Sequence, residues 1–432
     1  MVTALIAFAV MLALIFLRVP IAFAMGIVGF FGFAAILGNY SAALAMVRAV
    51  TYETGSEYNL SIVPMFILMG NLVSRSGMSQ ELYRAAYSFL GHRSGGLAMS
   101  TVVACGGFSA ICGSSLATAA TMSKVAMPEM KKYGYDPSLA AGSIAAGGTL
   151  GILIPPSVIL VIYGILTEQD IASLFAAGIL PGILGVLLYM AAVRWTTWRN
   201  PAAGPPGEKT PWGERARALL GVWGVLVLFL VVLGAIYTGY ATPTESAAVG
   251  AFGALVLALL RRSLTWRSFL DVLYESAATT AMLFVILIGA LIFANFINMT
   301  GMAQQLTSFA LSLETAPIFV IFFLVIVYLV LGCVLESLSM ILLTVPVFYP
   351  LVDGLGYDLV WFGIMVVVVT EISLITPPVG LNVFVLRSVL PEVGTGTIFR
   401  GVTPFWCADI VRLAIIILIP GLSLWLPSLF YG

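Results

Sequence analysis

Short runs of glycine, serine and threonine interrupt four long apolar segments of the chain. The segments are residues 96–127, 138–168, 318–349 and 359–390. Two of them also contain a proline pair, Pro155-Pro156 in the first half of the chain and Pro377-Pro378 in the second. Because proline removes a backbone donor and clashes with the preceding turn, two in succession force a helix to unwind. The released carbonyls and the nearby hydroxyls are hard oxygen ligands, which suit a cation such as Na⁺.

We expect Na⁺ to be the coupling ion and to bind at these interruptions. Each half of the chain supplies one hairpin tip and one proline-broken helix, so two related ion sites are expected. The candidate ligands in the first half are Gly113, Ser114, Ser115, Thr118, Thr149 and Gly151. Those in the second half are Glu336, Ser337, Ser339, Thr376 and Gly380. Glu336 is ionisable within an apolar segment, so it has a role in ion coordination or proton coupling, or a structural hydrogen-bonding role.

Each break also creates a new helix N-terminus, whose free N–H groups and dipole favour an anion. Four such ends are expected to converge near the centre of the protein, where a carboxylate binds without an arginine. The candidate substrate residues are Ser114, Ser157, Ser337, Thr376 and Asn382. Alternatively, the glycines and serines serve close helix packing, as they often do in membrane proteins. Four interruptions paired between the two halves favour the transporter interpretation.

Three further ionisable residues lie in apolar surroundings. Glu371 precedes Thr376 by five residues and is expected to brace that break. Asp409 and Arg412 are three residues apart, which predicts a local ion pair on one helix face.

The composition indicates the elements that must position these residues. Of the 432 residues, 61% are hydrophobic and 9% are charged, whereas soluble domains carry roughly 25% charged residues. Residues 171–193 and 277–297 are free of charge, and about 20 apolar residues cross a bilayer as a helix. We therefore predict an all-α polytopic membrane protein embedded in the lipid bilayer. The expected spans are 3–17, 20–38, 58–74, 138–168, 171–193, 218–240, 243–260, 277–297, 359–390 and 405–428.

The segments 96–127 and 318–349 are predicted to be re-entrant hairpins that enter and leave on the same side. This topology places nearly all of the 19 Lys and Arg residues on one side, with Arg48 opposite and Arg412 within a turn or two of the same side. By the positive-inside rule that side is cytoplasmic, so both termini are expected to be periplasmic.

The turn and helix-breaking motifs of the chain repeat at a spacing of 222 residues. Gly134-Tyr135-Asp136 corresponds to Gly356-Tyr357-Asp358, and the two proline pairs have the same spacing. The predicted topology gives the two halves opposite orientations, which is the inverted repeat of many secondary transporters. The expected divisions are a first repeat at 1–193, a cytoplasmic linker at 194–217 and a second repeat at 218–432.

Several other functions are disfavoured. The net charge of zero does not favour nucleic acid, and the single histidine, His92, disfavours a multi-histidine metal site. An intramembrane enzyme would need a serine–histidine or paired-aspartate site or Asp-rich magnesium motifs, none of which is present at the expected depth. A channel would need charged rings or a repeated filter. We predict a transporter rather than an enzyme.

Several motifs resemble those of a known transporter family. They are 113–118 (GSSLAT), 134–137 (GYDP), 151–157 (GILIPPS) and 376–382 (TPPVGLN). In combination they resemble the large membrane subunit of tripartite ATP-independent periplasmic (TRAP) transporters over essentially the whole chain.

This resemblance implies membership of the ion transporter superfamily and an elevator-type mechanism. It also implies sodium-coupled uptake of a carboxylate, such as a C4-dicarboxylate or a sugar acid, across the bacterial inner membrane. The implied partners are a small four-helix membrane subunit, as a separate chain, and a periplasmic substrate-binding protein. A stand-alone sodium–dicarboxylate symporter of the same superfamily is the alternative.

Overall fold

The computed structural model describes residues 2–312, 316–333 and 335–431. Across these residues every regular element is a helix, which confirms the predicted all-α class. Five helices are long and apolar enough to cross a membrane, or up to seven if two bent helix pairs each count as one span. The five are α10 (Ile171–Arg199), α13 (Pro243–Leu260), α14 (Trp266–Met299), α17 (Ser337–Gly354) and α20 (Thr395–Leu418).

The other helices have 18 residues or fewer, and three 3₁₀ turns lie between helices of the described residues, at Tyr58–Ser61, Leu150–Ile152 and Pro201–Ala203. In the first half they are α1 (Val2–Phe16), α2 (Ile21–Leu37), α3 (Tyr40–Ser56), α4 (Ile62–Arg75), α5 (Met78–Leu90), α6 (Gly96–Cys112), α7 (Ser115–Lys132), α8 (Pro137–Thr149) and α9 (Val158–Thr167). In the second half they are α11 (Trp212–Gly221), α12 (Trp223–Tyr237), α15 (Met302–Ser312), α16 (Pro317–Gly332), α18 (Leu359–Ile375), α19 (Leu381–Val389) and α21 (Gly421–Tyr431).

All four predicted interruptions are breaks between helices. They separate α6 from α7, α8 from α9, α16 from α17 and α18 from α19. Residue 334, within the predicted hairpin 318–349, lies outside the described residues. The re-entrant insertion of the hairpins, the inverted orientation of the two halves and the elevator motion stay predictions.

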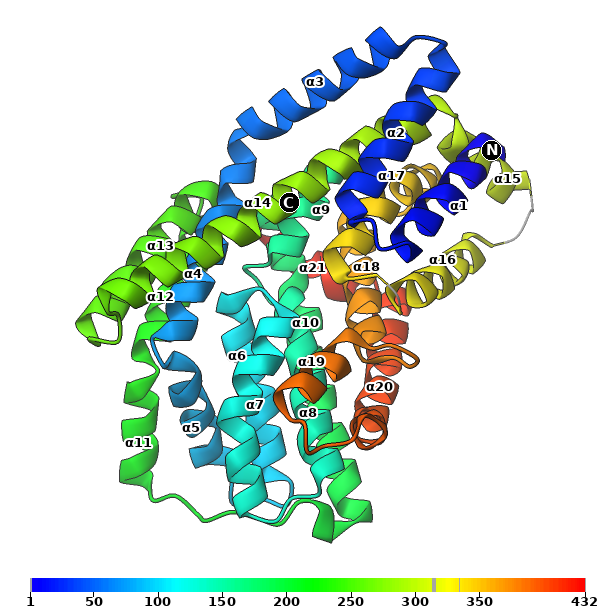
Figure 1. Cartoon of the computed structure of the whole chain (residues 1–432). Helices are drawn as coiled ribbons and strands as arrows, with labels where there is room; N and C mark the ends of the chain where they lie inside the picture. Colours follow the sequence, from blue (N-terminus) through cyan, green and yellow to red (C-terminus); the bar gives the residue numbers. More distant parts are fainter. Residues whose placement is uncertain (1, 313–315, 334, 432) are drawn as a thin grey trace.

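Some predicted boundaries are wrong. The segment 405–428 is two helices, because Pro420 has no N–H to continue α20. Helix α10 continues to Arg199, beyond the predicted span 171–193, and α11 begins at Trp212, before the predicted span 218–240. Helices α3 and α5 were not expected, because both are too polar to resemble spans, and α3 extends along the upper rim of the molecule (Figure 1).

The packing joins the two halves of the chain throughout. Helix α2 lies along α14, and α13 lies along α4. The second helix of each hairpin also packs against the short helix of the other half, so that α7 contacts α19 and α17 contacts α9. Helices α6, α7, α8 and α10 stand side by side in the lower part of Figure 1, where α20 flanks α8.

Glycines allow the closest of these crossings. Where α8 meets α20, a methyl group placed on Gly142 would lie 2.2 Å from the carbonyl oxygen of Gly401. A methyl group on Gly401 would lie 1.9 Å from the carbonyl oxygen of Ser138. Both neighbours are backbone atoms, so neither Gly142 nor Gly401 can be replaced even by alanine without displacing a helix.

We expect Gly401→Ala to lower the free energy of unfolding by about 1–3 kcal/mol, the usual cost of overpacking. The midpoint of thermal unfolding of the purified protein measures this. Gly396→Ala is the matched control on the same helix, because nothing lies within 4 Å of the added methyl group. Equal unfolding midpoints for the two variants would contradict this account of the crossing.

Candidate functional site

The first hairpin tip is a tight turn closed by a serine cap. Gly113 has a φ of 62° and ends α6, and Ser114 begins the next helix by accepting a hydrogen bond from the Ala117 N–H at 3.4 Å. Ser115 and Thr118, which follow on α7, are buried. The tip therefore presents backbone carbonyls and hydroxyls toward the protein interior.

In the first broken helix, the Ser157 side chain forms hydrogen bonds across the break. Helix α8 ends at Thr149, a 3₁₀ turn follows at Leu150–Ile152, and α9 begins only after the proline pair. The Ser157 hydroxyl donates to the Ile152 carbonyl at 2.5 Å and accepts from the Leu160 N–H at 3.3 Å. Ser157 thus forms hydrogen bonds on both sides of the break, so its buried hydroxyl has partners both as a donor and as an acceptor.

The hairpin tip lies directly against this break. A methyl group placed on Gly151 would lie 3.2 Å from Ser109 Oγ and 3.4 Å from the Ser114 carbonyl carbon. A methyl group on Gly148 would lie 3.1 Å from the Ser115 carbonyl oxygen. The glycines therefore allow two interrupted backbone segments to lie in close contact.

Two hydroxyls beside this contact are buried without a hydrogen-bond partner among the described residues. They belong to Ser109 and Thr118, both fully buried. A buried hydroxyl left unpaired costs about 1–3 kcal/mol, so a ligand that pairs it is favoured. Sequence reasoning identified Thr118 and missed Ser109, although Ser109 precedes Gly113 by one helical turn and so faces the same way.

The tip of the second hairpin begins with a carboxylate. The Glu336 carboxylate caps α17 by accepting from both the N–H and the hydroxyl of Ser339, each at 3.4 Å. Ser337 and Ser339 are buried, whereas Glu336 is exposed. The predicted residues of this tip therefore form one compact group.

The second broken helix is pinned by a tryptophan that the sequence did not single out. The Thr376 hydroxyl donates to the Ile372 carbonyl at 2.6 Å and accepts from Trp406 Nε1 at 3.0 Å. Gly380, with a φ of 59°, starts α19 after the proline pair. Thr376 accordingly has protein partners as donor and as acceptor.

Both hairpin tips line one cleft of about 290 Å³. Helices α4 and α14 complete its wall through Asn71 and Thr279, and Asn71 Nδ2 donates to Ser276 Oγ at 2.8 Å. The tip residues in the lining are Gly113, Ser114, Ser115, Leu116, Ala117, Glu336, Ser337 and Leu338. The cleft brings together residues more than half the chain apart, as expected for a site between two related halves.

The predicted substrate residues are only partly brought together. Ser114 and Ser337 line the cleft, whereas Ser157, Thr376 and Asn382 are not part of its lining. Asn382 is fully buried, and its Nδ2 donates to the Ala145 carbonyl at 3.1 Å, which ties α19 to α8.

The interior holds an arginine, contrary to expectation. Arg412 is fully buried between Glu371 of α18 and Asp409 of its own helix, and all three side chains are inaccessible. The Arg412–Asp409 pair is present as predicted, at 2.8 Å. Glu371 pairs with the same guanidinium, so Arg412 has a second carboxylate partner that the sequence did not indicate.

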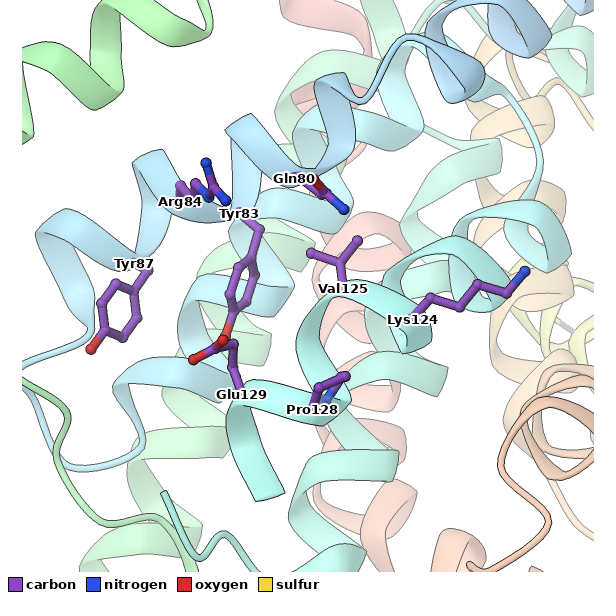
Figure 2. Close-up of a pocket in the computed structure, with 8 residues that line it drawn as sticks. All are labelled: Gln80, Tyr83, Arg84, Tyr87, Lys124, Val125, Pro128 and Glu129. Carbon is purple, nitrogen blue, oxygen red and sulfur yellow. The ribbon is translucent and has the colours of Figure 1, made fainter. Parts of the chain in front are cut away.

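A second cleft, of about 410 Å³, lies between α5 and α7. Figure 2 shows Tyr83 extending from α5 toward Glu129 of α7, with Arg84 and Lys124 also in the lining. Its lining contains no residue of a hairpin tip or helix break. We therefore assign the candidate site to the cleft between the two tips.

A family model described as the DctM component of tripartite ATP-independent periplasmic transporters matches residues 8–422. The chain belongs to the DctM family. The C4-dicarboxylate TRAP transporter large permease protein DctM of Pseudomonas aeruginosa is 37% identical over 87% of this chain and 88% of that relative. The isethionate TRAP transporter permease protein DctMQ of Oleidesulfovibrio alaskensis is 34% identical over 86% of this chain and 58% of that relative.

The fold of this DctM-family chain also resembles a solved transporter structure. The YdaH transporter of Alcanivorax borkumensis superposes with a TM-score of 0.64 at 16% identity, over 88% of this chain and 89% of that one. The resemblance inferred from the motifs is thus confirmed. Because its relatives are transporter permeases, the prediction that the chain is not an enzyme is confirmed as well.

Proposed function

We propose that this DctM-family protein performs sodium-coupled uptake of a small organic anion across the bacterial inner membrane. In this proposal it is the translocating subunit, and its partners are a small four-helix membrane subunit and a periplasmic substrate-binding protein. The observation that carries the proposal is the single cleft lined by the hairpin tips 113–117 and 336–338.

The chemistry of this cleft accounts for a dependence on sodium. The N-termini of α7 and α17 begin at the two tips, and the N–H groups that the Ser114 and Glu336 caps leave unpaired favour an anion. Glu336 lines the same cleft, so a bound carboxylate faces another negative charge. Na⁺ bound near the tips offsets this repulsion, because opposite charges a few ångströms apart attract each other even at a partly hydrated site.

The unpaired hydroxyls of Ser109 and Thr118 support an ion site next to the first tip. The carbonyls of Ser114 and Ser115 and the backbone at Gly151 complete an oxygen-lined environment there. Hydroxyl and carbonyl oxygens suit Na⁺, and the carboxylates of Glu371 and Asp409 are already paired with Arg412.

An elevator motion follows from the same polar groups. An empty, open site would carry unpaired backbone groups past lipid at a cost of several kcal/mol each. Substrate and Na⁺ together cover these groups, so neither ligand alone permits the crossing.

The names of relatives support the substrate class and the partners. C4-dicarboxylate and isethionate, named for two relatives, are both small organic anions. The DctMQ relative is longer than this chain, which spans 58% of it. We infer that its extra length includes a counterpart of the separate small subunit proposed here.

We expect uptake of a C4-dicarboxylate or another small organic acid into proteoliposomes only when every component is present. The components are this chain, the small subunit, the binding protein and an inward sodium gradient, and radiolabelled uptake is the measurement. Replacing sodium with potassium at equal concentration is the control. Uptake without the binding protein would instead establish the alternative, a stand-alone symporter of the same superfamily.

A further inference from the structure

A buried polar network extends from the ion cluster to the first broken helix. Arg412 of α20 pairs with Glu371 of α18 and with Asp409, and all three are fully buried. The Tyr189 hydroxyl, on α10, donates to Asp409 Oδ2 at 2.5 Å. The same hydroxyl lies 3.1 Å from Thr149 Oγ1, at the last residue of α8 before the break.

Two hydroxyl hydrogens serve three contacts in this network. A hydrogen bond to a charged acceptor is stronger than one between neutral groups, so the Tyr189 hydrogen points to the Asp409 carboxylate. The Thr149 hydrogen has two acceptors, the Ala146 carbonyl at 2.7 Å and the Tyr189 oxygen at 3.1 Å, and the shorter bond is the one to Ala146. The Tyr189 oxygen is therefore a second, longer contact of the Thr149 hydroxyl.

Helix α10 is shaped around this cluster. A methyl group placed on Gly185 would lie 2.4 Å from Arg412 Nη1, so glycine at this position leaves the space that the guanidinium fills. One turn further along, the Tyr189 ring meets Phe405 edge-on at 5.5 Å between centroids. The hydroxyl of Tyr189 is therefore held in place by packing as well as by its hydrogen bonds.

We propose that Tyr189 is a positioning residue for sodium binding, because it ties Thr149 to the ion cluster on α18 and α20. The inference rests on the proposed sodium coupling and on Thr149 acting as one of the ligands expected for the first ion site. Glu371 precedes the second break, at Thr376, by five residues. The network thus links α8 to α18, which are the helices that precede the two breaks.

The test compares Tyr189→Phe with Tyr163→Phe. Both tyrosines are fully buried, and each substitution removes one hydrogen-bonding hydroxyl, since the Tyr163 hydroxyl donates to the Leu359 carbonyl at 2.6 Å. The measurements are the sodium-induced rise in the unfolding midpoint of the purified chain, against potassium, and the sodium concentration for half-maximal uptake in the full complex. We expect Tyr189→Phe to raise that concentration about three- to tenfold with little change in maximal rate, as the loss of one hydrogen bond implies.

Tyr163→Phe is expected to lower the unfolding midpoint without changing the sodium response. Equal sodium responses in the two variants would overturn the inference. A wild-type protein without any sodium response would overturn the proposed coupling itself, and it would do so before any variant is compared.

A second pair of variants tests the inference in case the Tyr189→Phe protein does not fold. Thr149→Ser keeps the hydroxyl that faces Tyr189, and Thr149→Val removes it. We expect the serine variant to keep its sodium response and the valine variant to lose it. If both keep it or both lose it, the link through Tyr189 is wrong.

Discussion

The Arg412→Leu variant is expected to yield almost no folded protein. The substitution leaves the carboxylates of Glu371 and Asp409 fully buried without their counter-charge. Breaking a buried ion pair from one side costs about 3–5 kcal/mol, a large part of the total stability of most domains. The yield of monodisperse protein after detergent extraction and size-exclusion chromatography measures the effect.

Two further variants decide whether buried charge is the cause. Replacing Arg412, Glu371 and Asp409 together with leucine removes the whole cluster, and such replacements are often neutral or stabilising, so the folded yield is expected to recover. Arg75→Leu breaks an ion pair with Glu275 whose side chains are 44% and 49% exposed, so it is expected to have little effect. Normal yield of the Arg412→Leu variant would show that the interior tolerates the two carboxylates.

Thr118→Val is expected to have opposite effects on stability and on transport. Valine has the shape of threonine, and the hydroxyl it replaces is buried without a partner, so the unfolding midpoint in potassium stays the same or rises. Apparent sodium affinity in uptake is expected to fall more than tenfold, because an oxygen contact with a charged group contributes about 1.5–3 kcal/mol.

Thr101→Val is the matched control on the adjacent helix α6. Thr101 is also fully buried, but its hydroxyl donates to the Leu97 carbonyl of its own helix at 2.9 Å. This variant is expected to keep its sodium affinity. If Thr118→Val transports with unchanged sodium affinity, the unpaired hydroxyl is not an ion ligand.

The sequence predicted the four breaks because their cause is local. Proline pairs end helices, and glycine, serine and charged residues interrupt apolar segments, so Pro155-Pro156, Pro377-Pro378, Gly113-Ser114 and Glu336-Ser337 indicated the four interruptions. The apolar composition likewise predicted long helices. These features depend on neighbouring residues alone.

The sequence could not predict contacts that depend on distant elements. Arg412 was expected to pair with Asp409 alone, because nothing in its own helix shows that Glu371 meets the same guanidinium. The bond from Trp406 to Thr376 and the cleft position of Asn71 have the same origin in tertiary packing. Helices α3 and α5 were missed for another reason, since a search for apolar spans passes over polar, amphipathic helices.

The contacts between helices of the two halves constrain the order in which this protein can fold during its synthesis. Helix α7 finds its neighbour α19 only after residue 389 has been synthesised, although α7 itself ends at residue 132. Until then the face of α7 that packs on α19 is uncovered, although the tip itself already lies against Gly148 and Gly151. During that interval the insertion machinery or a chaperone must shield this face of α7. Quality-control proteases would accordingly remove chains truncated before α19, whatever the integrity of their first half.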